Sequence, residues 1–414
     1  MSETKKYKLI TEQQLLRGMM GGKDSCANCL AMFKIHGEID AARLEAAVQK
    51  TIDNNPALRL VFETDESGDV YQHLGDGYNY ALDLRDIASA EDPQKELAKQ
   101  MFTVIDDHTH FDGGFMFNFT LFRMAAQEYL FVSCVNHIIS DGTSNSIIVK
   151  KIIANYNGID NKKEKHTYID YIEESLALAG SGALQAQRRY WEKECEGYED
   201  KVVFPTGGRK KYAAKILQKI ETASVRKIAS KFSVSMASVN LFLCHLAYSA
   251  ALNHHDIAIN VAEQNRLRKY RQTVGTFAIS LFHRVRFTED TGLYQALADS
   301  FSKLSENFDH SRVIAPRKTP FIFSYENFIG KGSEGMKLGE APIESYMGTL
   351  EAKVWNIFSM LIFEGQDEII YKVGYDEEVF DEQMIRRFKA YFALGMEVLL
   401  GEDMTYGQLT KKVK

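Results

Sequence analysis

The spacing of apolar residues in the first half of the chain predicts alternating strands and helices. Apolar residues fall on one face of residues 44–52, which predicts a helix. Residues 115–123 alternate and residues 129–135 are almost wholly apolar, so we expect two strands, the second buried on both faces. Ile148, Ile152 and Tyr156 then recur at every fourth position and predict an amphipathic helix that ends at Asn157 and Gly158.

The second half shows the same mixture of periods. The longest apolar stretch, residues 234–252, carries Asn240 and His245 and predicts a buried central helix rather than a membrane span. The remaining elements are predicted as helices at 223–232 and 381–400 and as strands at 257–261, 277–287, 321–325, 357–363 and 369–375. Both halves therefore mix strands with helices, and no short internal repeat is visible.

The length of 414 residues predicts two domains. Residues 157–165 are polar and charged, and residues 177–182 are rich in Gly and Ala, as in an exposed connection. We therefore expect a boundary near residue 175, with domains at 1–175 and 176–414.

Composition and charge exclude several classes of protein. Apolar residues make up 45% and charged residues 26%, as in a folded globular protein. The net charge is -6 and the longest basic run is Arg209 to Lys211, so nucleic acid is not an expected partner. Five cysteines do not suggest a disulfide framework, and residues 1–7 lack the apolar core of a secretory signal. We expect a cytoplasmic location and no membrane span.

The most informative local pattern is His137 followed by Asp141 and Gly142, between a predicted strand and a predicted helix. This spacing is expected by chance on the order of 0.04 times in a chain of this composition. A His at the end of a strand can act as a general base on a hydroxyl or an amine. The alternative is structural: His137 is a buried core residue, Asp141 caps the helix, and Gly142 eases a turn.

These residues fit an HxxxDG motif and resemble the condensation-domain superfamily. That superfamily includes condensation domains of nonribosomal peptide synthetases, chloramphenicol acetyltransferase, and acyltransferases with an HHxxxDG or HxxxDG motif. Further patches are similar in the same order: Gly37, Ile39, Asp40, Leu44, Pro56, Leu58, Arg59 and Phe62; Tyr190 and Trp191; residues 264–266 with Val274, Gly275, Phe277, Leu281 and Arg284; and residues 321–327 with Tyr375, Asp376, Phe380 and Asp381. The resemblance implies an α+β fold of two chloramphenicol-acetyltransferase-like α/β sandwich halves, arranged as a V in one chain.

The resemblance also implies roles for individual residues. His137 is expected to be the general base, and Asp141 is expected to pair with an arginine of the other half, best matched by Arg284. The absence of a side chain at Gly142 lets substrate approach the amides that open the next helix, and these could stabilise charge on a thioester oxygen. Asn136, Asn356 and Ser359 are expected to bind substrate.

The sequence departs from the family pattern at three points. The first His of HHxxxDG is replaced by Asn136, the Asn of VGxFxN is replaced by Ile279, and no DFGWG occurs, which disfavours the plant branch.

The implied activity is acyl transfer from a CoA or carrier-protein thioester to an alcohol or amine. The thioester is a cosubstrate, and no cofactor or metal is expected. The implied partners are a small-molecule acceptor and either acyl-CoA or a separate acyl or peptidyl carrier protein. The alternative is a non-catalytic, condensation-like protein that binds a carrier protein or a small molecule.

Other chemistry is disfavoured. Cys26 and Cys29 form a single CxxC with no second pair. His108 with His110, and His254 with His255, lack supporting ligands and are expected at the surface. No GxSxG, P-loop or GxGxxG pattern indicates a hydrolase, a kinase or a dehydrogenase.

Overall fold

The computed structural model describes residues 5–20, 28–106, 114–161, 163–202, 212–316, 319–326, 335–346 and 358–413. The chain divides into two compact units. Unit 1 comprises Met1–Ala183, Gln264–Ala278 and Gly330–Leu350, and unit 2 comprises Leu184–Glu263, Ile279–Ile329 and Glu351–Lys414. The units do not follow the expected ranges 1–175 and 176–414. Residue 175 lies inside helix α5 (Tyr168–Gly180), and two later segments pack in unit 1.

Unit 1 is built on a mixed six-stranded sheet. Its strand order is β12-β13-β2-β7-β6-β5. The strands are β2 (Asn28–His36), β5 (Asp83–Asp86), β6 (Phe117–Ala125), β7 (Glu128–Asn136), β12 (Lys337–Leu338) and β13 (Ala341–Ser345). Strand β7 pairs antiparallel with both β2 and β6, while β5 runs parallel to β6. Strand β13 reaches this sheet from far along the sequence and pairs with β2. The sheet therefore buries β7 on both faces, as the sequence predicts.

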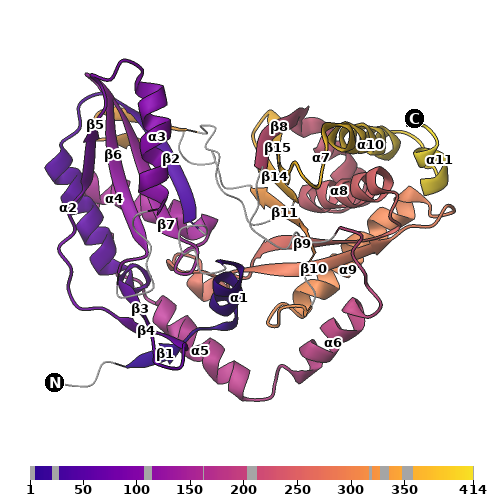
Figure 1. Cartoon of the computed structure of the whole chain (residues 1–414), viewed down its shortest axis with the longest axis horizontal. Helices are drawn as coiled ribbons and strands as arrows, with labels where there is room; N and C mark the ends of the chain where they lie inside the picture. Colours follow the sequence, from indigo (N-terminus) through magenta and orange to yellow (C-terminus); the bar gives the residue numbers. More distant parts are fainter. Residues whose placement is uncertain are drawn as a thin grey trace. The chain divides into compact units, whose positions relative to one another are not determined.

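Helices cover both faces of this sheet. Helices α2 (Ala41–Asn54) and α4 (Gly142–Tyr156) pack together, and their apolar residues meet Phe33 and Phe131 of the strands. Helix α3 (Pro93–Asp106) covers the opposite face, where it packs on Phe122 and Val132 (Figure 1). Neighbouring residues of a strand point to opposite faces, so Phe131 faces α2 and α4, whereas Val132 faces α3.

A small second sheet completes unit 1. It consists of β1 (Lys6–Lys8), β3 (Leu60–Thr64) and β4 (Val70–Leu74), in the order β1-β4-β3. Helix α1 (Thr11–Met20) follows β1, a short 3-10 helix (Pro56–Arg59) precedes β3, and α5 contacts β1. A capping box between Thr167 and Asp170 starts α5.

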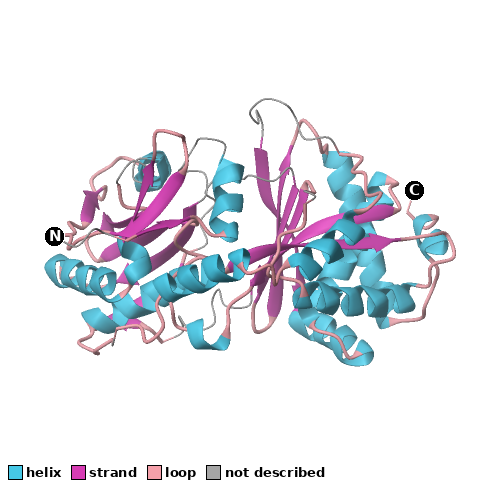
Figure 2. Cartoon of the chain, turned by 90° about the horizontal axis from the view of Figure 1, so that it is seen from below, coloured by secondary structure: helices cyan, strands magenta, loops and turns pink. Residues whose placement is uncertain are grey.

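Unit 2 contains a second six-stranded sheet, in the order β10-β9-β11-β14-β15-β8. Its strands are β8 (Tyr212–Glu221), β9 (Asp256–Gln264), β10 (Ala278–Arg286), β11 (Phe321–Glu326), β14 (Phe358–Glu364) and β15 (Glu368–Asp376). Its helices are α6 (Gln185–Cys195), α7 (Thr222–Phe232), α8 (Met236–Leu252), α9 (Leu293–Asp309), α10 (Glu382–Leu400) and α11 (Tyr406–Thr410). Figure 2 shows these strands beside their helices. The expected α+β class is confirmed.

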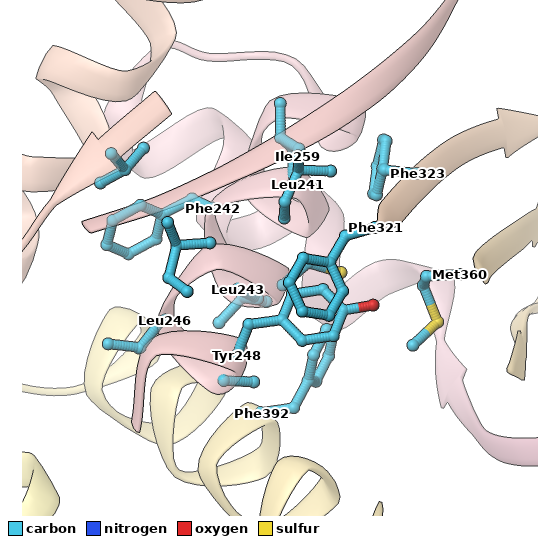
Figure 3. Packing of buried hydrophobic residues seen from close by; sticks show 14 of the residues in the cluster. Leu241, Phe242, Leu243, Leu246, Tyr248, Ile259, Phe321, Phe323, Met360 and Phe392 are labelled. Carbon is cyan, nitrogen blue, oxygen red and sulfur yellow. The ribbon is translucent and has the colours of Figure 1, made fainter. Parts of the chain in front are cut away.

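Helix α8 is the buried central helix that the sequence predicts. Every residue from Ser238 to Ala251 is buried, and the ring centroid of Tyr248 lies 4.3 Å from that of Phe321 (Figure 3). Its polar residues are accommodated inside: Asn240 accepts a hydrogen bond of 2.6 Å from the hydroxyl of Tyr371. Burial holds the pKa of His245 well below its usual value, which keeps this residue neutral.

In the described part of the chain, no single helix is long and apolar enough to cross a membrane. Helices α7 and α8 meet the criteria of length and hydropathy only as a pair, and the chain bends by 95° at the break between them.

We predict that Gly275→Ala destabilises unit 1. A Cβ atom at this position would lie 2.2 Å from Cδ2 of the fully buried Tyr168, so the ring would have to move. Overpacking of this kind costs about 2–3 kcal/mol, measured as the free energy of unfolding in denaturant. Gly180→Ala is the matched control, because nothing lies within 4 Å of that position at the end of α5. An equal effect of the two changes would contradict the assigned packing.

Candidate active site

The loop that carries His137 joins the end of β7 to the start of α4. Its backbone turns back on itself, because the N–H of Ile139 donates to the carbonyl of Asn136 over 3.2 Å. The side chain of Asn136 tightens the same turn, since its Oδ1 accepts the N–H of Ile138 over 2.9 Å. A short polar side chain can thus replace a backbone partner in a turn. The loop is held by both main-chain and side-chain bonds.

His137 is half-buried on this loop. Its Nδ1 atom is buried and has no hydrogen-bond partner among the described residues. Most buried polar side-chain atoms in native proteins have such a partner. Ring nitrogens of His245 and His254 are also unpaired within the described ranges, but neither residue lies in this loop. Nδ1 of His137 is therefore not committed to a structural bond with the described part of the protein.

Asp141 combines both roles considered from the sequence. It is the N-cap of α4, where its Oδ1 accepts the N–H of Ser144 over 2.7 Å. The same carboxylate forms an ion pair with Arg266, with Nη2 lying 2.8 Å from Oδ1 and 3.0 Å from Oδ2. Its Oδ2 also accepts the N–H of Phe277 over 3.0 Å. Only 2% of the Asp141 side chain and 5% of the Arg266 side chain are exposed, so the pair is shielded from water.

Arg266 also bonds to the segment that contains it and to Ser144, while its Nε has no partner among the described residues. Its Nη1 donates to the carbonyls of Tyr270 over 3.0 Å and Thr273 over 2.5 Å. Its Nη2 donates to Oγ of Ser144, which is itself bonded to the backbone of Gly275. One buried cation therefore ties the start of α4 to residues 264–278. These contacts all lie within unit 1.

The expectation that Arg284 pairs with Asp141 is wrong. Arg284 lies on β10 in unit 2, where Nη2 is 2.6 Å from Oδ2 of Asp256. Its Nη1 donates to the backbone carbonyls of Glu194 and Glu196. Both arginines belong to the stretch that resembles the family, and the sequence contains no signal that separates them. The structure selects Arg266 because residues 264–278 pack in unit 1.

The other expected site residues lie in different surroundings. Gly142 is the first residue of α4 and is half-buried, as expected for a residue at the opening of that helix. Asn136 is fully buried and Ser359 is 2% exposed, with its hydroxyl donating to the carbonyl of Gly374 over 3.3 Å. The bonds described for their side chains are local, and their expected contact with substrate stays a prediction. Asn356 lies outside the described residues.

A buried pair, Glu164 and Lys151, was not anticipated from the sequence. Oε1 of Glu164 accepts the N–H of Val274 over 2.7 Å and lies 3.3 Å from Nζ of Lys151. Burial raises the pKa of Glu164 to about 7 and lowers the pKa of Lys151. The pair is a second attachment of residues 264–278 to unit 1. The sequence gives only a charged connection at 157–165, in which no residue is marked as buried.

Metal binding finds no support in the described ranges. These contain no group of three or more His, Cys, Asp or Glu residues placed to hold a metal ion. Cys26, His108 and His110 lie outside the described residues. His255 is exposed as expected, whereas His254 is half-buried.

We predict that Arg266→Met lowers the free energy of unfolding by about 3 kcal/mol. The change leaves the Asp141 carboxylate buried without its counter-ion, and breaking a buried pair is strongly destabilising. Denaturant unfolding measures the loss. Lys50→Met is the control, because its exposed pair with Asp160 contributes little. A loss below about 1 kcal/mol for Arg266→Met would show that the pair does not hold this loop.

We predict that Glu164→Gln changes the pH dependence of stability. The folded-state pKa of Glu164 lies above its ordinary value of 4.5, so its contribution is fully present below pH 4.5 and is lost as pH rises through about 7. The free energy of unfolding is measured at pH 5 and pH 8 for the variant and for wild type. We expect the difference, variant minus wild type, to be more positive at pH 8 than at pH 5 by on the order of 2 kcal/mol. Glu174→Gln, an exposed residue paired with Lys269, is the control. A pH-independent difference between Glu164→Gln and wild type would contradict the assignment.

Comparison with known proteins identifies the family of this chain. The model of the family described as Condensation domain matches residues 3–401. Bacitracin synthase 1 from Bacillus licheniformis is 22% identical over 91% of this chain, and tyrocidine synthase 3 from Brevibacillus parabrevis is 21% identical over 91% of it. The chain spans only 8% and 6% of the lengths of these two relatives.

Solved structures show the same fold at low identity. The condensation domain from Monacolin K polyketide synthase MokA has a TM-score of 0.81 at 17% identity, covering 97% of this chain and 99% of that chain. The starter condensation domain of rhizomide synthetase RzmA, solved in complex with C8-CoA, has a TM-score of 0.80 at 14% identity, covering 97% of this chain and 96% of that chain. The chain therefore belongs to the condensation-domain family of acyl- and peptidyl-transfer proteins.

Proposed function

We propose that this chain transfers an acyl group from the thioester of CoA or of a carrier protein to an amine or an alcohol, with His137 as the general base. The observation that carries the proposal is that His137 is only half-buried and that its ring makes no hydrogen bond to the described residues, on a loop whose backbone is fixed by hydrogen bonds. A general base needs a nitrogen that is free to take a proton. The surrounding bonds involve Asn136 and Asp141 and leave the imidazole uncommitted.

The reaction balances without a further reagent. The neutral imidazole takes the proton of the attacking N–H or O–H while the nitrogen or oxygen bonds to the thioester carbonyl carbon. The tetrahedral intermediate then collapses, the C–S bond breaks, and the imidazolium returns its proton to the leaving sulfur. The products are an amide or an ester and a free thiol.

The opening turn of α4 offers donors for the oxygen of this intermediate. The first N–H groups of a helix have no partner within it, and the Asp141 cap uses that of Ser144. The N–H groups of Gly142 and Thr143 are left over by the cap, beside the loop that carries His137. Donors aimed at a developing oxyanion are a large contribution in acyl transfer.

The similar proteins support a thioester donor. The RzmA starter domain is described in complex with C8-CoA, and bacitracin synthase 1 is a much longer protein than this chain. We therefore propose acyl-CoA or a separate acyl or peptidyl carrier protein as donor, with a small amine or alcohol as acceptor.

We predict that His137→Ala lowers turnover by about 100-fold or more, because the proton must then pass to water. The assay offers acyl-CoA and acyl-pantetheine donors with a panel of amines and alcohols, and follows thiol release. His36→Ala is the control, since this exposed histidine of unit 1 pairs with Glu344. Unchanged turnover in His137→Ala would overturn the proposed base.

A second candidate is a non-catalytic, condensation-like protein that binds a carrier protein or a small molecule. The observation that favours it is Asn136, which stands where many relatives carry the first His of the motif and turns its side chain back onto the loop. Binding of a donor without turnover, unaffected by His137→Ala, would select this candidate.

A further inference from the structure

Two glutamines form a fully buried pair beside the loop of His137. Gln13 belongs to α1 and Gln72 to β4, and neither is exposed. Each amide donates to the other: Nε2 of Gln13 lies 2.9 Å from Oε1 of Gln72, and the return bond measures 2.7 Å. Glutamine is mostly a surface residue, so a fully buried reciprocal pair requires a reason.

The remaining amide hydrogens of this pair, and a second lone pair of Gln13 Oε1, bond to backbone. Nε2 of Gln13 donates to the carbonyl of Ile138 over 3.2 Å, and its Oε1 accepts the N–H of Ile10 over 3.1 Å. Nε2 of Gln72 donates to the carbonyl of Lys8 over 3.2 Å. Both amide groups therefore have all their hydrogens engaged, and their orientation is fixed.

Ile138 is the residue that directly follows His137, and both of its backbone groups are held. Oδ1 of Asn136 accepts its N–H, and Gln13 donates to its carbonyl. The peptide that links His137 to Ile138 is fixed by the first bond, and the next peptide is fixed by the second. The Ile138–Ile139 peptide held by Gln13 also carries the N–H of Ile139, which donates to the carbonyl of Asn136 in the peptide before His137. Both peptide planes that flank the Cα of His137 are therefore restrained, and so is the direction in which its side chain leaves the backbone.

We propose that Gln13, clamped by Gln72, is a positioning residue that sets the orientation of His137 through the carbonyl of Ile138. This inference rests on the proposed function of His137. A catalytic group must sit close to its productive position, and a misplacement of about 1 Å can cost as much as 100-fold in rate. A buried amide that reaches from α1 to this one carbonyl provides such a constraint.

The alternative is that the pair only fills and stabilises the core of unit 1. Methionine has nearly the same shape as glutamine and no hydrogen-bonding amide, so Gln13→Met separates the two possibilities. Gln14→Met is the control for the same substitution on the same helix, at an exposed position. Gln14 is the next residue on α1, and its Nε2 bonds to the carbonyl of Leu9 rather than to the His137 loop.

The first experiment measures kcat and KM for Gln13→Met and Gln14→Met, each in the wild-type and the His137→Ala backgrounds. We expect Gln13→Met to lower kcat by about tenfold or more, with both KM values within about twofold of wild type. In the His137→Ala background Gln13→Met should leave the residual rate unchanged, because its effect passes through the imidazole. A drop of equal size in both backgrounds, or a wild-type kcat in folded Gln13→Met, overturns the positioning role.

The second experiment does not depend on turnover. The ring resonances of His137, assigned by their loss in His137→Ala, are recorded by NMR for the full chain. We expect them to shift or broaden in Gln13→Met and to stay in place in Gln14→Met; unchanged resonances overturn the inference. If Gln13→Met does not fold, Gln13→Leu serves instead, because it also removes the donor to Ile138 and buries no charge.

The two proposals fail in different ways. Full turnover in His137→Ala removes the proposed base whatever Gln13 does. Loss of turnover in His137→Ala together with unchanged kcat and unchanged resonances in Gln13→Met removes only the positioning role.

Discussion

The buried ion pair between Asp141 and Arg266 is the constraint on which the site depends. Bringing a carboxylate and a guanidinium out of water is costly, and the cost is offset only where further hydrogen bonds satisfy both groups. Here Asp141 also receives the N–H groups of Ser144 and Phe277, and Arg266 also donates to the carbonyls of Tyr270 and Thr273. The pair thereby fixes where α4 begins and how residues 264–278 lie against it. The loop that precedes α4 is therefore fixed at the end where it enters the helix.

The loop of His137 is thus restrained at both of its ends. Asp141 secures the end that enters α4, while Asn136 and Gln13 secure the two peptides that follow His137. All of these supporting side chains are buried, and each is bonded to backbone, so they act on main-chain geometry rather than on the ring. The imidazole is the group in this loop whose Nδ1 is left unpaired among the described residues. Rigid support around one uncommitted polar group is typical of a functional site.

Local elements with a clear hydrophobic period could be predicted from the sequence, whereas their assembly could not. The helices α4, α8 and α10 and the strands β7, β14 and β15 lie within a few residues of their predicted ranges. Helices α3 and α9 and the edge strand β8 are not predicted from the sequence. Apolar and polar residues do not alternate cleanly along β8, although the exposure of its residues largely alternates. The expected single boundary near residue 175 differs from the two units of the structure for another reason. Pairing of β13 with β2 joins segments about 300 residues apart, and no local period records such a partner.

The features of the site that depend on local spacing could likewise be predicted from the sequence, whereas those that depend on long-range packing could not. His137, Asp141 and Gly142 could be found because their spacing is local, and the need for a buried cation beside Asp141 follows from the cost of an unpaired charge. Which cation serves is a question of packing: Arg266 and Arg284 both fit the sequence pattern, and only the placement of residues 264–278 in unit 1 decides between them. Gln13 illustrates the same limit, since nothing near it in sequence indicates that its amide reaches Ile138. Burial requires that a polar group have a partner, and the fold alone determines which partner it is.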